Sequence, residues 1–196
     1  MLTRNLLAGP FLLTTVVAAL LSTSSLAQTP AGLIRPDPDS PIGTRNTNAP
    51  AELQQLEFLI GDWSVALVLH GPEGDRSYEA RWHNIWIVNG FAIMQEWRDA
   101  HSTGAEFRTY NPRTGRWEGR NYYAGEPTWT VSEGAFTDGE FIVETRSGRP
   151  GDLTVGRERY FDIQPNSFRM VATRSLDGGL TWSAPTYEMV CTRLVE

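Results

Sequence analysis

The chain has 196 residues, a length typical of one domain, and contains 40% hydrophobic and 20% charged residues. Its formal net charge is −6, and this acidic balance without a basic cluster excludes a nucleic-acid surface built on positive charge. All 17 basic residues are Arg, so catalysis by a Lys side chain is excluded. The one cysteine, Cys191, excludes an internal disulfide and a Cys-based zinc site.

The first 27 residues have the pattern of a cleavable secretory signal. Arg4 supplies a positive charge, a mostly apolar stretch covers residues 6–21, and Ser25 and Ala27 are small residues at the expected cleavage site. The alternative is a transmembrane anchor, which requires about 20 unbroken apolar residues. We therefore expect cleavage after Ala27, a periplasmic or secreted protein, and no stable membrane anchor after cleavage.

Residues 28–50 contain five prolines and few large apolar side chains. Proline lacks a backbone donor and keeps the preceding residue out of helical conformation. This segment is therefore predicted to be a disordered linker that leads to one folded domain, residues 51–196.

The folded part begins with a short helical pattern over residues 51–59, which places Leu53 and Leu56 on one face and stops at Gly61. After it, alternating apolar and polar residues are broken by turn sequences such as Asn-Gly and Asp-Gly, which predicts β-strands joined by hairpins. The expected strands cover residues 62–70, 76–88, 91–99, 104–110, 115–124, 127–135, 139–146, 153–163, 167–175 and 184–194. About ten antiparallel strands must cover their edges, and a single up-and-down β-barrel does this best. A two-sheet sandwich is the alternative.

The alternation also predicts which side chains face the barrel interior. Charged residues such as Arg81 and Glu96 are expected to face solvent, which turns their neighbours inward. No carboxylate is expected to face inward. In residues 153–163 the alternation does not decide which side faces inward, because Arg157 and Arg159 fall on the same side of the strand as Val155 and Phe161. The candidate ligand-binding residues on three neighbouring strands are Trp82, Asn84, Trp86, Gln95, Trp97, Asn121 and Tyr123.

Four segments carry a resemblance to a known family. They are FLIGDW at residues 58–63, VNGFAIMQEWR after a Trp-rich strand, FRTYNPRTGRW across a hairpin, and SLDGGLTW near the end. In this order they make the folded part resemble a family of uncharacterised secreted bacterial proteins with a lipocalin-like barrel of the calycin superfamily. The resemblance implies that Trp63 of the Gly-x-Trp motif closes one barrel end and that Arg193 packs over its indole. It implies no particular reaction.

Two further patterns concern enzyme and metal chemistry. Residues 175–182 match the Asp-box, S-x-D-x-G-x-T-W, of sialidases and related propellers. The motif occurs once, so we interpret it as a structural hairpin in which Asp177 caps the turn and Trp182 packs; a sugar-handling role is the alternative. The three histidines lie on separate segments without ligand spacing, so no metal or haem cofactor is expected.

The seven tryptophans are the strongest positive signal for function. Five are expected to share the interior: Trp82, Trp86, Trp97, Trp117 and Trp129. They fit either a filled aromatic core or a ligand cavity in which Asn84, Gln95 and Asn121 supply polar contacts.

The sequence leads to a barrel that binds a small, largely apolar molecule in its interior. One alternative is an enzyme, an isomerase or hydrolase, acting on such a molecule. The other is a sugar-binding module that uses Tyr122, Tyr123 and Trp129 as stacking faces.

Overall fold

The computed structural model describes residues 35–149 and 152–195, so the expected signal, residues 1–27, lies outside the described residues. The described chain forms one short 3₁₀-helix, η1 (Ala51–Leu59), and ten strands. The strands are β1 (Gly61–Leu69), β2 (Arg76–Ile87), β3 (Ala92–Asp99), β4 (Thr103–Asn111), β5 (Arg116–Tyr123), β6 (Glu126–Thr137), β7 (Glu140–Arg149), β8 (Asp152–Gln164), β9 (Ser167–Ser175) and β10 (Tyr187–Arg193). Every expected strand is confirmed, with small differences at the ends.

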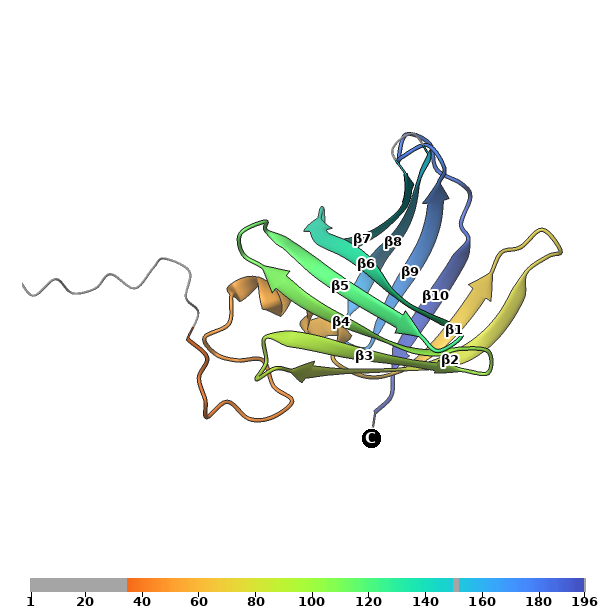
Figure 1. Ribbon diagram of the computed structural model, residues 1–196. Helices are drawn as coiled ribbons and strands as arrows, with labels where there is room; N and C mark the ends of the chain where they lie inside the picture. Colours follow the sequence, from red (N-terminus) through yellow and green to blue (C-terminus); the bar gives the residue numbers. More distant parts are fainter. Residues whose placement is uncertain (1–34, 150–151, 196) are drawn as a thin grey trace, which may run out of the picture. The chain divides into compact units, whose positions relative to one another are not determined.

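The ten strands form one closed, antiparallel, up-and-down barrel (Figure 1). Each strand pairs with its neighbours in sequence, and β10 closes the barrel by pairing with β1, where Trp63 lies opposite Arg193. This arrangement confirms the predicted barrel and excludes the two-sheet sandwich. Among the described residues, no helix has the length and apolar content needed to cross a membrane.

The predicted hairpin turns form where Asn-Gly and Asp-Gly occur. Asp138 and Gly139 join β6 to β7 with φ values of 53° and 84°. A two-residue turn with positive φ at both positions is the type I′ geometry, which matches the twist of antiparallel strands. The β2–β3 turn likewise has positive φ at Asn89 and Gly90.

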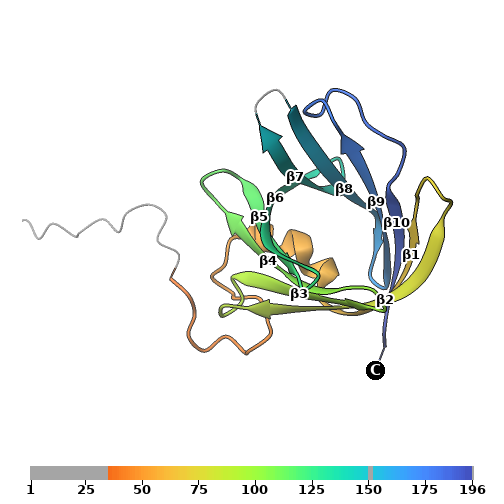
Figure 2. The ribbon, with the colours of Figure 1, turned by 45° about the vertical axis from the view of Figure 1, so that its right-hand side comes forward.

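Helix η1 lies across one end of the barrel, which we call the closed end (Figure 2, orange ribbon). Its buried residues are Leu53, Leu56 and Leu59. Their spacing of three suits a 3₁₀-helix, in which residues i and i+3 eclipse one another. Gly61, the first residue of β1, has a φ of 119°, which L side chains rarely adopt, and a Cβ there would lie against the Arg193 guanidinium.

Residues 35–50, part of the predicted linker, lie against the barrel. Asn46 is fully buried, its side chain accepts a hydrogen bond from the backbone N–H of Asp37, and its own N–H donates to the carbonyl of Gly90. Asn89 also donates to the carbonyl of Asp37 at 2.8 Å. This part of the segment is therefore attached to the β2–β3 turn at several points, and its flexibility stays a prediction.

The interior phase follows the prediction on most strands. The buried residues of β2, β3, β7 and β9 alternate as expected, with Trp82, Trp97 and Phe141 inside. On β6 the prediction was wrong, because Trp129 is 59% exposed. Its ring packs outside the barrel against Phe107, at a centroid distance of 6.2 Å.

Candidate functional site

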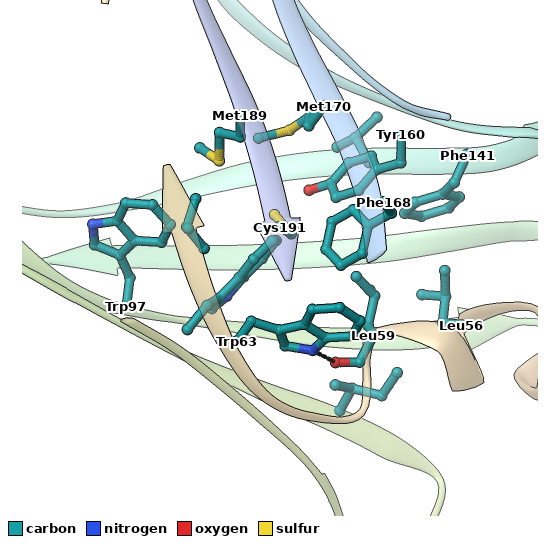
Figure 3. Packing of buried hydrophobic residues seen from close by; sticks show 14 of the residues in the cluster. Leu56, Leu59, Trp63, Trp97, Phe141, Tyr160, Phe168, Met170, Met189 and Cys191 are labelled. Carbon is teal, nitrogen blue, oxygen red and sulfur yellow. Dashed lines mark hydrogen bonds between the residues drawn. The ribbon is translucent and has the colours of Figure 1, made fainter. Parts of the chain in front are cut away.

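The closed end is sealed around Trp63. The fully buried indole donates from Nε1 to the carbonyl of Leu59 at 2.8 Å and packs edge-on against Phe168 (Figure 3). The guanidinium of Arg193 lies 4.2 Å from the indole ring centre and donates to the carbonyls of Phe58 and Ile60. The predicted geometry of both residues is thus confirmed.

Two further tryptophans hold helix η1 at this end. Trp86 donates to the Glu57 carboxylate at 3.4 Å, and Trp117 donates to the Gln55 side chain at 3.2 Å. Both indoles are buried and hydrogen-bonded to a helix that comes from outside the sheet. They belong to a filled core, so the closed end favours the packed-core interpretation of the tryptophans.

The other end of the interior holds a cavity of about 320 Å³. Five of the seven predicted ligand-binding residues line it: Trp82, Gln95, Trp97, Asn121 and Tyr123. Asn84 and Trp86 are buried in the same interior but do not line this cavity. Further along its wall are Leu67, Leu69, Tyr78, Glu106, Glu158, Tyr160, Met170, Tyr187 and Met189.

A polar row crosses the barrel interior from β2 to β5, and its members on β3, β4 and β5 line the cavity. Strand register places Asn84 opposite Gln95, Gln95 opposite Glu106, and Glu106 opposite Asn121. Directly opposed residues point to the same face of a sheet, so the row is continuous. Both side-chain polar atoms of Asn84, Nε2 of Gln95 and Oδ1 of Asn121 are buried without a hydrogen-bond partner in the described structure. Such orphaned groups cost about 1–3 kcal/mol each unless a ligand or water satisfies them.

Arg108 links this row to the opposite wall. Only 2% of its side chain is exposed, and it donates to Oε1 of Gln95 at 2.7 Å, to Glu106 at 2.8 Å and to the Tyr160 hydroxyl at 3.2 Å. Burial raises the pKa of Glu106, while the charge of Arg108 opposes that shift. Burial alone would lower the pKa of Arg108, but Glu106, Tyr160 and Glu158 together outweigh it and raise that pKa, so the guanidinium keeps its charge.

Glu158 receives the hydroxyls of two tyrosines. Tyr160 donates to one carboxylate oxygen at 3.1 Å, and Tyr187 donates to the other at 2.5 Å. Burial and then the charge of Glu158 raise the pKa of both phenols well above the ordinary value, which keeps their protons in place. One connected network therefore runs behind and along the wall, from Ser132 through Glu106, Arg108 and Tyr160 to Glu158.

Two glycines make room for this network. A Cβ at Gly119 would lie 2.1 Å from the Ser132 hydroxyl and 2.7 Å from the Glu106 carboxylate. A Cβ at Gly104 would lie 2.5 Å from the ring of Tyr123. Both distances are shorter than real contacts allow, so the small residues on β4 and β5 permit the buried carboxylate and the tyrosine ring.

The expectation that no carboxylate faces inward was wrong. On β4 the inward residues are Glu106 and Arg108, whereas the apolar Phe107 faces outward. On β8, Glu158 and Tyr160 face inward, which resolves the ambiguous phase. The hairpin turns fix how neighbouring strands align, and this alignment could have revealed Glu106. It places Glu106 directly opposite Gln95 and Asn121, two amides that were predicted to face inward.

The exposed aromatic residues do not form the predicted stacking platform. Tyr122 and Trp129 lie on the outer face with their rings tilted by 46°, whereas Tyr123 lines the cavity. These three residues therefore do not share one surface.

The Asp-box forms a turn, as predicted. Asp177 accepts hydrogen bonds from the backbone N–H groups of Leu180 and Thr181, and Arg157 lies 3.7 Å from the ring centre of Trp182. The Thr181 hydroxyl also donates to Asp177, and these contacts hold the pKa of that carboxyl well below its usual range.

The histidines occupy separate places. His83 pairs with Asp62, and His70 pairs with Asp75 and Glu188. In residues 35–149 and 152–195, no group of three or more His, Cys, Asp and Glu side chains is arranged to hold a metal ion.

A scan against models of protein families finds no match to this chain, and a search of curated proteins finds none either. The barrel is consistent with the calycin-like fold that the four sequence segments implied.

Proposed function

We propose that this protein binds one small organic molecule in the cavity of its barrel. The carrying observation is a volume of about 320 Å³ beside unpartnered polar atoms of Gln95 and Asn121. Ligand sites are concave and mostly apolar, with a few polar groups that orient the ligand, and this volume lies near the lower end of their range. Bulky residues on facing walls, among them Trp82, Trp97 and Met170, supply the apolar surface.

A titration followed by tryptophan fluorescence tests the proposal. The probes are fatty acids, retinoids, porphyrins and environment-sensitive aromatic dyes, and we expect saturable binding of at least one at a single site. Gln95→Leu should change that affinity several-fold, whereas Gln164→Leu, on an exposed residue at the end of β8, should not. Failure of every probe to saturate would contradict the proposal and leave a packed interior.

One observation favours a second function, an enzyme that moves a proton on the bound molecule. Glu158 and its two phenol partners lie on the cavity wall, and carboxylates and phenols serve as general acids and bases. Mass spectrometry of a bound compound recovered after incubation separates the two functions. A binder returns the compound unchanged, whereas an enzyme converts it and loses the conversion in Glu158→Gln.

Export is part of the same proposal. The N-terminal pattern and the resemblance to secreted bacterial barrel proteins support a periplasmic or secreted location. N-terminal sequencing of protein purified from its native host should find Gln28 as the first residue, and a mature chain that still begins at Met1 would contradict it.

A further inference from the structure

The cavity wall has an excess of negative charge. Three carboxylates line it, from Asp99, Glu106 and Glu158, and neither Arg nor His is among the described lining residues. Trp97 donates to Asp99 at 2.6 Å, and this and neighbouring hydrogen bonds overcome the effect of burial and lower the pKa of Asp99. Asp99 therefore stays ionised at the rim.

Arg108 forms a direct ion pair with only one of these carboxylates, Glu106, and its charge reaches Glu158 without a contact. Its donors are directed within the wall, to Glu106, Gln95 and Tyr160, and its guanidinium lies 5.3 Å from the ring centre of Phe141. A cation held this way stabilises Glu106 and offers little to a molecule in the cavity. An anionic ligand would thus meet carboxylates without a free cation.

Glu158 has a different environment. Its hydrogen-bond partners in the described chain are the two phenols of Tyr160 and Tyr187, and it forms no ion pair among these residues. The phenol donors satisfy part of the hydrogen-bonding capacity of the carboxylate, and no cation contacts it directly in the described chain. A cation that enters the cavity can pair with this carboxylate.

The aromatic wall and the orphaned amide agree with this assignment. Trp82 and Trp97 pack edge to face on the cavity wall, with their ring centres 6.0 Å apart. The faces of indole rings attract organic cations. Gln95 is 1% exposed, and its Nε2 donor has no partner although its Oε1 accepts from Arg108. A ligand acceptor such as a hydroxyl or carbonyl oxygen would satisfy that donor.

We infer that the ligand is an organic cation, with an ammonium group that pairs with Glu158, an apolar body between the Trp82–Trp97 wall and the Met170–Met189 wall, and an oxygen that accepts from Gln95. This inference rests on the proposed function, because it names the chemistry of the molecule bound in the same cavity.

Three probes with one skeleton test the charge: 4-phenylbutylamine, 4-phenylbutanol and 4-phenylbutyrate, each titrated into the unmodified protein by calorimetry. The amine should bind about tenfold or more tightly than the alcohol, as expected for a charge-assisted contact, and the carboxylate should bind most weakly. Equal affinities for amine and alcohol, or tighter binding of the carboxylate, would overturn the inference while leaving the proposed function intact. Saturable binding by none of these probes, nor by the wider set above, would contradict the proposed function itself.

The variant Glu158→Gln tests whether this carboxylate is the group that favours the amine probe over the alcohol. This variant should remove the advantage of the amine and leave the affinity of the alcohol within about twofold, because an amide keeps the size of the side chain. Glu133→Gln, an exposed carboxylate on the outer face of β6, is the matched control and should keep the advantage of the amine. Loss of that advantage in both variants, or in neither, would contradict a pairing with Glu158. If Glu158→Gln does not fold, the three-probe comparison on the unmodified protein still decides the charge of the ligand.

Discussion

The two ends of the barrel interior are built from the same strands but have opposite chemistry. At the closed end, three indoles donate to helix η1, and leucines and Phe168 fill the remaining space. At the other end, the next inward residues along the strands are amides, carboxylates and phenols around a cavity. The comparison teaches that one end holds the barrel together, whereas the other retains buried polar groups that cost stability unless a ligand or water satisfies them.

Truncation at the closed end should have the largest effect. Trp63→Ala removes a fully buried indole and its contact with Arg193, so the free energy of unfolding should fall by about 4 kcal/mol. Arg193→Ala should cost less, and the double variant should be less destabilised than the sum, because the two groups touch. Urea unfolding measures each value. Trp129→Ala is the matched control on the outer face and should cost under about 1 kcal/mol. A loss that small for Trp63→Ala would show that this residue does not seal the barrel.

Removal of the buried cation should come next. Arg108→Met leaves Glu106 buried without its partner, and we expect a loss of about 3 kcal/mol in urea unfolding. Adding Glu106→Gln should restore most of it, because the uncompensated charge is gone. Arg159→Met breaks an exposed pair with Glu140 and should cost under about 1 kcal/mol. Equal losses of unfolding free energy in Arg108→Met and Arg159→Met would contradict the expectation that a buried ion pair costs more to break than an exposed one.

The same substitution, Trp to Ala, can be made at Trp86 near the closed end and at Trp97 beside the cavity. Trp86→Ala should lower the unfolding free energy by about 3 kcal/mol and leave the affinity of a bound probe unchanged, because Trp86 contacts helix η1 and does not line the cavity. Trp97→Ala should weaken probe binding several-fold and cost less stability. Fluorescence titration and urea unfolding of both variants measure the effects, and the reverse pattern would refute the division of the interior.

The smallest effect is expected at the Asp177 turn, which belongs to neither end. Hydrogen bonds from Thr181 and Ser175 lower the pKa of Asp177 in the folded chain. The carboxylate therefore stabilises the turn above its unfolded pKa of about 3.9, and this contribution is lost as the pH falls through the lower folded value. The protection of the Leu180 and Thr181 amides against hydrogen exchange, measured relative to the intrinsic exchange rate at each pH, should fall on acidification, with the cavity unaffected. Asp177→Asn should abolish this pH dependence.

The sequence was sufficient for the framework but not for the polar wall. Period-two patterns and turn residues predicted all ten strands, and the resemblance implied the Trp63–Arg193 contact. Phase assignment assumed that charged residues face solvent, which fails on β4, where Glu106 and Arg108 neutralise each other inside the barrel. The inward prediction for Trp129 did not follow from this assumption, because Trp129 shares a parity with the charged Glu133 on the same strand. Burial of a charge depends on its partner, and that partner is set by register across strands rather than by the pattern along one strand.

The closure of the barrel by β1 and β10 has a consequence for folding kinetics. Every other pairing joins consecutive strands, so those hairpins form with little loss of loop entropy. The seam between β1 and β10 joins the two ends of the domain, and we expect it to form late, after the transition state. Substitutions along the seam, such as Ala66→Gly opposite Val190, should therefore accelerate unfolding and leave the folding rate almost unchanged. Because Trp63 and Arg193 face each other across this seam, we expect the contact that seals the barrel also to set the lifetime of the folded state.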